Sequence, residues 1–257
     1  MNIWKSMLVA LSLYSKLPVP QINWTRQNMA YALAFFPLVG LLVSAVLLLW
    51  CWLSVKLAFG RVLFAAGCTL IPVLITGGIH MDGFCDVSDA LSSWQTKERR
   101  LEILKDSHIG AFALISLVCY LLAYFAVWTE IRPAAPVCFW AALMFPLCRT
   151  LSGLGIVNLR CAKKSGLAAT FAGNAERSGV TAALCCWLVL IAGVMLGMNW
   201  LAGVLSLGLA AGCFWLFRRV SYRDFGGING DLAGWFLQML ELGWLIMLLV
   251  LQKLQVL

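Results

Sequence analysis

Long apolar runs constrain the fold of this chain more than any other feature of its sequence. Residues 41–53 and 237–251 are apolar almost throughout and do not alternate between apolar and polar positions. A bilayer requires every backbone polar group to be paired internally, which leaves helices or a closed barrel, and barrel strands alternate. The runs therefore predict membrane helices. The composition, 62% hydrophobic and 12% charged, also lacks the polar residues needed to cover a soluble globule.

The positions of the runs predict an all-α fold, a polytopic membrane helical bundle that forms one domain over residues 1–257. A membrane span needs about 20 apolar residues. Seven segments meet this requirement: 31–53, 62–79, 111–130, 134–157, 180–198, 200–217 and 233–251. Almost no loop separates the fifth segment from the sixth. Residues 2–15 carry apolar side chains at helical spacing before a proline-containing turn, which predicts a short N-terminal interfacial helix.

The distribution of basic residues predicts how the bundle is oriented. Of the 19 Lys and Arg residues, 14 fall in loops on the side of the N-terminus. Only Lys56, Arg61, Arg132 and Lys253 fall on the opposite side, and Arg149 lies inside a span. Basic loops stay in the cytoplasm, so the N-terminus is expected there. The net charge of +8 therefore indicates contact with anionic lipid headgroups and not with nucleic acid.

Acidic residues gather in one short stretch of the chain. Six of the 11 Asp and Glu residues lie between positions 82 and 106. Asp82, Asp86 and Asp89 stand at i, i+4 and i+7, so on a helix they share one face and repel one another unless a cation lies between them. Oxygen ligands without a thiolate or a His pair favour magnesium or manganese. The alternative is a solvated loop whose acids pair with neighbouring bases, and we prefer it for Glu98 and Glu102.

Two further segments are candidate phosphate sites. Residues 106–110 (Asp-Ser-His-Ile-Gly) and residues 226–231 (Gly-Gly-Ile-Asn-Gly-Asp) each precede a predicted span on the same side of the membrane as the acidic stretch. Free N–H groups at a helix start can bind phosphate, although a simple N-cap explains the first segment equally well. Gly77, Gly78 and Gly83 would permit close approach by a ligand.

Three polar residues stand in apolar surroundings. Arg149 and Glu241 lie within predicted spans, where charge is costly, so we expect them to pair with each other or with the active site. His80 lies two residues before Asp82. A structural role for this histidine and a role in proton transfer or phosphate binding are equally compatible with its position.

These residues together resemble the cobalamin synthase (adenosylcobinamide-GDP ribazoletransferase) family, and the matching landmarks run in order along nearly the whole chain. The acidic block is the most specific part of the resemblance. The landmarks are Lys16-Leu17-Pro18-Val19-Pro20, Phe36-Pro37-Leu38-Val39-Gly40, Thr76-Gly77-Gly78, His80, Asp82-Gly83, Asp86, Asp89, Arg99, Leu101-Glu102-Ile103, Asp106-Ser107, Gly110, Arg149, Phe171, Gly173, Gly226-Gly227, Gly230-Asp231, Gly234 and Glu241.

The resemblance implies a multi-pass enzyme of the bacterial inner membrane whose active site faces the cytoplasm. It implies that α-ribazole, or its 5′-phosphate, is joined to adenosylcobinamide-GDP with release of GMP. Magnesium, or manganese in its place, would be held by Asp82, Asp86, Asp89 and Asp106, and the catalytic residues would be His80, Asp82 and Asp106. The implied substrate-binding residues are Gly77, Gly78, Arg99, Lys105, Ser107, Gly110, Arg149, Gly226, Gly227, Gly230 and Asp231.

Other readings of the sequence make different predictions. A transporter or cation channel would place acids near the bilayer midplane and show two related halves, and no internal repeat is visible here. A membrane phosphotransferase that acts on a lipid alcohol would share the metal site, and only the family resemblance separates it. Beyond the two substrates and the lipid bilayer, a homo-oligomer and an association with other cobalamin-pathway enzymes stay open.

Overall fold

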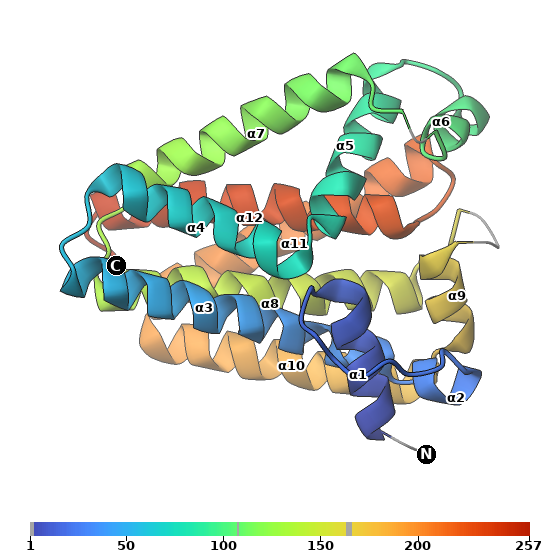
Figure 1. Cartoon of the computed structure of the whole chain (residues 1–257), viewed down its shortest axis with the longest axis horizontal. Helices are drawn as coiled ribbons and strands as arrows, with labels where there is room; N and C mark the ends of the chain where they lie inside the picture. The colour runs from blue at the N-terminus through green and yellow to red at the C-terminus, as the bar shows by residue number, and fades with distance from the viewer. Residues whose placement is uncertain (1–2, 107, 163–165) are drawn as a thin grey trace.

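The computed structural model describes residues 3–106, 108–162 and 166–257, and the described part is helical (Figure 1). Its only β contact is an isolated parallel bridge between Cys161 and Ile228. Six helical segments are long and apolar enough to cross a membrane, and a bent pair of helices could supply a seventh span. The prediction of a polytopic helical membrane bundle is confirmed.

The spanning helices lie close to the predicted segments. The first combines α2 (Arg26–Met29), the 3-10 helix η1 (Ala32–Phe35) and α3 (Phe36–Lys56). The others are α7 (Ala111–Glu130), α8 (Ala135–Asn158), α10 (Arg177–Met198), α11 (Trp200–Asp224) and α12 (Gly230–Lys253). Shorter helices complete the described chain: α1 (Ile3–Tyr14), α6 (Lys97–Ile103) and α9 (Leu167–Asn174).

The predicted span 62–79 does not form one straight helix. Helix α4 (Arg61–Thr76) ends early, and α5 (Ile79–Ser92) leaves at an angle of 95°. Gly77 and Gly78 both have positive φ angles, 66° and 78°, which only glycine adopts without strain, so the break is encoded locally. The acidic stretch that follows forms a helix and not the alternative solvated loop, because Asp82, Asp86 and Asp89 all lie on α5.

The hairpin between α10 and α11 turns through one residue. Asn199 separates the two helices, its side-chain oxygen accepts a hydrogen bond from the Ala202 amide at 3.0 Å, and its Nδ2 donates to the Val256 carbonyl at 2.7 Å. An N-cap of this kind satisfies a backbone donor that would otherwise be unpaired. The nearly loopless connection in the sequence is therefore a well-capped turn.

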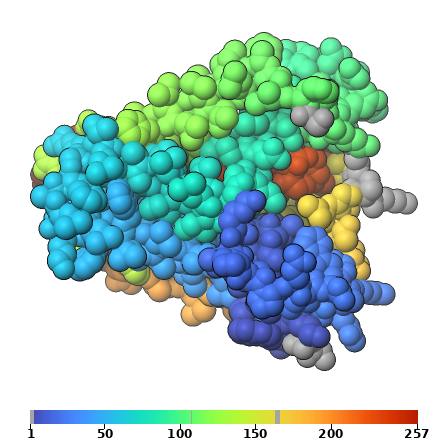
Figure 2. All heavy atoms as spheres, viewed as in Figure 1, coloured from blue at the N-terminus to red at the C-terminus, as the bar shows by residue number. Residues whose placement is uncertain are grey.

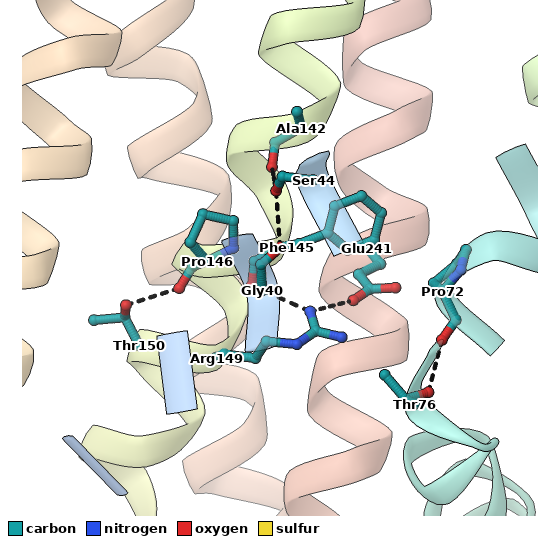
Figure 3. Close-up of polar contacts among 10 residues, drawn as sticks. All are labelled: Gly40, Ser44, Pro72, Thr76, Ala142, Phe145, Pro146, Arg149, Thr150 and Glu241. Carbon is teal, nitrogen blue, oxygen red and sulfur yellow. Dashed lines mark hydrogen bonds and ion pairs between the residues drawn. The ribbon is translucent and has the colours of Figure 1, made fainter. Parts of the chain in front are cut away.

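Helix α8 forms the centre of the bundle and packs on α3, α10 and α12. Pro146 lies inside α8 and has no N–H, so the carbonyl of Ala142 lacks its helical donor. Ser44 of α3 replaces that donor, with its hydroxyl oxygen 2.6 Å from the Ala142 oxygen (Figure 3). A Cβ at Gly40 would lie 2.6 Å from the backbone at Phe145, so a glycine is required for this close approach of α3.

The connections separate into two ends of the bundle. The α3–α4 and α7–α8 connections and the C-terminus lie at one end, on the left of Figure 1, whereas α2, α6 and α9 lie at the other. The connections between these spans thus lie at the ends that the predicted order of the spans gave them. The acidic helix α5 runs from the middle of the bundle toward the end that carries α6 (Figure 1).

Candidate active site

A cavity of about 460 Å³ lies between α1, α5, α8 and α12. Figure 2 shows the hollow on the surface, bordered by α1 in dark blue, α5 in green-blue and α9 in yellow, with the red α12 visible inside it. Polar side chains of distant parts of the sequence line it: His80, Asp82, Lys105, Ser152, Asn229 and Asp231. A concave, mostly apolar pocket with a few converging polar groups is the usual form of a binding site.

Four carboxylates from two helices form what we call the acidic cluster: Asp82, Asp86, Asp89 and Asp231. The charges of Asp82, Asp231 and Asp89 all act on Asp86. Asp82 and Asp231 line the cavity, and Asp86 and Asp89 follow one and two turns later on α5. Among the ion pairs of the described residues, none includes Asp82, Asp86 or Asp89.

Close packing of α5 against α12 brings Asp231 into the cluster. A Cβ at Gly83 would lie 2.8 Å from the Cα of Asp231, and one at Gly234 would lie 3.0 Å from the carbonyl oxygen of His80. Gly83 was predicted to admit a ligand, but in the structure it admits the backbone of α12. The sequence placed Asp231 in a candidate phosphate-binding segment and gave no signal that it lies near Asp82 and Asp86 of α5.

The donor set of the acidic cluster suits a hard cation, because all four side chains offer oxygen. In the described part of the chain, however, no three His, Cys, Asp or Glu side chains converge closely enough to hold one metal ion. Rotation of the side chains would be needed to bring the oxygens together, and Asp82 is exposed enough to rotate.

Asp106 lies apart from the acidic cluster. Its Oδ1 accepts hydrogen bonds from the backbone amide of His108 at 3.0 Å and pairs with the ring Nδ1 of His108 at 2.7 Å. These bonds hold the pKa of the Asp106 carboxyl below its usual value. Ser107 lies outside the described residues. Gly110 connects this segment to the cluster, because the Asp89 carboxylate occupies the space where a Cβ of residue 110 would stand.

The basic candidates near the site differ in their surroundings. Lys105 lines the cavity, as expected for a residue that holds phosphate. Arg99 points elsewhere: it pairs with Glu102 at 2.7 Å, and both side chains are 63% exposed. The pairing of Glu102 with a neighbouring base was the reading we preferred from the sequence, and it is confirmed.

Another basic residue of α6 forms a contact that the sequence did not signal. Arg100 reaches α11 and pairs with Asp224 at 2.5 Å, in a largely buried setting. Asp224 also pairs with its neighbour Arg223 at 2.9 Å. These contacts tie α6 to the end of α11, and Lys105 follows α6 directly along the chain.

Only part of the glycine-rich segment 226–231 lines the cavity, and the rest shapes the turn before it. Gly230 and Asp231 line the cavity. Gly227 packs against the segment after α8, where a Cβ would lie 2.6 Å from the carbonyl oxygen of Arg160, and Gly226 has a positive φ of 76°. The Ile228 amide donates to the Arg160 carbonyl at 2.9 Å and its carbonyl accepts from Ala162 at 2.8 Å. Gly226 and Gly227 thus shape the turn that presents Gly230 and Asp231.

Arg149 and Glu241 form a buried ion pair that connects α8 to α12. The Nη1 of Arg149 lies 3.0 Å from the Oε1 of Glu241, and both side chains are 1% exposed (Figure 3). The same nitrogen donates to the Phe145 carbonyl at 3.1 Å. The prediction that these two charges pair with each other is confirmed, and burial separates Arg149 from the cavity where a substrate-binding role was expected.

His80 stands between the buried ion pair and the cavity. Its ring is 5% exposed and lines the cavity, and the positive charge of Arg149 acts on it. Its Nε2 has no hydrogen-bond partner among the described residues. Tyr14 of α1 also lines the cavity, which the sequence did not signal, because α1 was expected only to lie in the interface.

The fold and the cavity together define an integral membrane enzyme whose site is built from acidic, basic and glycine residues of separate helices. Residues 6–249 match the family model described as cobalamin-5-phosphate synthase, so the chain belongs to that family. It is a multi-pass membrane transferase of cobalamin biosynthesis.

Curated relatives agree with this assignment. A protein of Lachnoclostridium phytofermentans named adenosylcobinamide-GDP ribazoletransferase is 43% identical over 92% of this chain and 90% of its own length. Proteins of the same name from Clostridium perfringens and Desulfitobacterium hafniense are 33% and 31% identical, over 95% and 94% of this chain and 97% and 95% of their own lengths. No solved structure matches the chain.

Proposed function

We propose that this chain joins α-ribazole, or its 5′-phosphate, to adenosylcobinamide-GDP. A ribose hydroxyl oxygen forms a bond to the phosphorus that carries the cobinamide group. The bond from that phosphorus to the bridging oxygen breaks, GMP leaves with the oxygen, and the hydroxyl proton goes to a base. The product is adenosylcobalamin or its 5′-phosphate. The observation that carries the proposal is the cavity that joins Asp82 and Asp231 to Lys105, in a chain with relatives of this name.

The acidic cluster supports a requirement for a divalent cation, magnesium or manganese. Asp82, Asp86 and Asp89 have no ion pair among the described residues, so their charges would repel the diphosphate of the substrate, and a bound cation would make that interaction attractive. Asp82, Asp86, Asp89 and Asp231 are the residues that would hold it. When bound, such an ion neutralises charge on the diphosphate and the leaving group. Asp106 is the less suitable ligand, because it is engaged with His108.

The other polar residues of the cavity have separate tasks in this proposal. Lys105 binds a phosphate oxygen as a point charge, and Asn229 orients Asp231, to which its Nδ2 donates a hydrogen bond at 2.9 Å. His80 is the proposed group for proton transfer, since it lies in the cavity wall two residues before Asp82. Because the structure gives Asp106 a different partner, it stays the second candidate for the base.

We also infer the orientation in the membrane. The connections at the end of the bundle that carries α2, α6 and α9 (Figure 1) contain most of the basic residues. Loops of this kind stay in the cytoplasm. The active site and the N-terminus are therefore assigned to the cytoplasmic side of the bacterial inner membrane, where water-soluble nucleotide substrates are available.

Turnover of the purified protein in lipid tests the proposal directly. With adenosylcobinamide-GDP and α-ribazole 5′-phosphate present, we expect GMP and a cobalamin product to appear in equal amounts. GMP release without a cobalamin product would indicate hydrolysis, and the absence of both in folded protein would contradict the proposal. A lipid alcohol with a CDP-activated donor serves as the negative control, and a product there would favour the lipid phosphotransferase instead.

A further inference from the structure

The residues that line the cavity change in character along α12. Asn229, Gly230 and Asp231 belong to its start, whereas Ala233, Gly234 and Leu237 lie further along the helix. Leu237 is six residues beyond Asp231, about 9 Å deeper along the helix axis. The cavity therefore has a polar entrance at the acidic cluster and an apolar interior.

Three rings meet in one wall of this cavity, which we call the aromatic wall: Tyr14, Phe36 and His80. The ring centroids of Tyr14 and Phe36 lie 4.2 Å apart, those of Phe36 and His80 5.7 Å apart, and those of Tyr14 and His80 6.2 Å apart with planes inclined by 24°. All three residues line the cavity. Tyr14 is half-buried, whereas Phe36 is 1% and His80 5% exposed, so Tyr14 offers most of the ring surface to a planar ligand and the other two rings pack behind it.

Helix α1 is held so that Tyr14 keeps its place in the wall. Leu8, Val9 and Ala10 of α1 are buried, and the Lys16 amide just after the helix donates to the Ile75 carbonyl at 2.8 Å. On the outer side Trp4 is 64% exposed. The interfacial helix thus has an anchored inner face that ends at the cavity.

This inference rests on the proposed function, and it asks which part of the two substrates the cavity binds. The size and the chemistry of the cavity both answer that question. A volume of about 460 Å³ suits a nucleoside and is too small for a corrinoid macrocycle with its side chains. Two aromatic bases take part, guanine and the dimethylbenzimidazole of α-ribazole. Guanine carries several hydrogen-bonding groups on its edge, more than the two polar side chains away from the entrance, His80 and Ser152, could pair. Dimethylbenzimidazole has an apolar rim that matches Leu13, Ile156 and Leu237.

We propose that the apolar interior and the aromatic wall of this cavity bind the benzimidazole base of the acceptor, with Tyr14 of α1 as a specificity-determining residue. The ribose of the acceptor then points toward Asp82 and Lys105 at the entrance. The diphosphate of the larger substrate reaches this entrance from outside, and its corrinoid part stays out of the cavity. Helix α1 is in this view part of the nucleoside site as well as an interfacial anchor.

Kinetics with Tyr14→Leu and Tyr14→Phe in lipid test the inference. We expect Tyr14→Leu to raise KM for α-ribazole 5′-phosphate about tenfold, to leave KM for adenosylcobinamide-GDP unchanged, and to weaken equilibrium binding of α-ribazole by a similar factor. Tyr14→Phe keeps the ring and should recover most of the affinity. Trp4→Leu, on the exposed side of the same helix, is the matched control and should behave as wild type.

Each alternative outcome has a definite meaning. An unchanged KM and affinity for the nucleoside in Tyr14→Leu, or an increased KM for adenosylcobinamide-GDP alone, would overturn the inference while leaving the proposed function intact. Wild-type protein that binds α-ribazole but makes no cobalamin would defeat the proposed function and leave the subsite standing. Phe36→Leu gives the same test from another helix if Tyr14→Leu does not fold.

Discussion

Helix α12 carries two carboxylates with opposite surroundings. Glu241 is 1% exposed and is neutralised by Arg149, whereas Asp231 lies in the first turn of the helix, acts on Asp86 through its charge and lines the cavity with Asp82. The two positions are ten residues apart in sequence, which corresponds to about 15 Å along the helix. The first carboxylate joins two helices within the bundle, and the second belongs to a concentration of negative charge at the cavity.

This difference teaches how to read charge in a membrane chain. A charge buried in the bundle is retained when it has a partner, and the balanced pair is then part of the packing. The three aspartates of α5 have no ion pair among the described residues, and like charges gathered in this way are unfavourable for folding, so they indicate a ligand that supplies the missing charge. The predictions below change one region while leaving the other intact.

The largest expected effect comes from removing divalent cations. Chelation with EDTA should abolish turnover, a loss of about 1,000-fold or more, because the acidic cluster would then repel the diphosphate. Adding magnesium or manganese back should restore it. The thermal unfolding midpoint should fall when the cation is removed, because the like charges of the acidic cluster then repel one another, and it should recover with the cation. Turnover that persists after exhaustive chelation would remove the acidic cluster from the reaction.

Breaking the buried ion pair should mainly affect stability. Glu241→Leu leaves the Arg149 charge buried and unpaired, which costs about 3–5 kcal/mol. The double variant Arg149→Met/Glu241→Leu removes both charges and should recover most of that loss. Thermal unfolding in lipid measures both variants, and a single variant as stable as wild type would show that the pair does not support the bundle.

Gly83→Ala tests whether α12 must approach α5 closely for the acidic cluster to form. The new Cβ would meet the backbone of Asp231 at 2.8 Å and push the two helices apart. A displacement of this order should reduce turnover about 10- to 100-fold. Gly208→Ala is the matched control, because a Cβ there meets nothing within 4 Å. Equal activity of the two variants would show that the packing is not critical.

The smallest effect is expected at the exposed pair of Arg99 and Glu102. Because both side chains are 63% exposed, Glu102→Gln should change the free energy of unfolding by less than about 1 kcal/mol. Arg99→Ala separates the two readings of this arginine. An unchanged KM for adenosylcobinamide-GDP agrees with a surface pair, whereas a large increase would place Arg99 at the diphosphate, as the family resemblance implied.

Much of the fold could be predicted because bilayer spans have a simple signal in sequence. The bounds of α7 coincide with the predicted segment 111–130, and most other spans start and end near their predicted residues, although α11 continues to Asp224, seven residues beyond the predicted end. The break after Thr76 was missed, because the apolar run continues across Gly77 and Gly78 while their positive φ angles turn the chain.

The site was predictable in part. The spacing of Asp82, Asp86 and Asp89 follows from helical periodicity, and the pairing of Arg149 with Glu241 follows from the cost of burying charge. The approach of Asp231, the Arg100–Asp224 contact and the place of Tyr14 depend on how distant helices pack, which no local pattern encodes. The glycines at 83 and 234 could have signalled close helix packing, although a ligand explained them equally well.

The most direct test of the contrast between the two carboxylate regions is the turnover of Asp86→Asn per mole of folded protein in lipid. Asp86 is acted on by the charges of Asp82, Asp231 and Asp89 but has no ion-pair partner among the described residues, so its charge should be needed for the reaction and not for the fold. We predict an unfolding midpoint equal to or above that of wild type with turnover reduced about 1,000-fold. Wild-type turnover in folded Asp86→Asn would contradict the account.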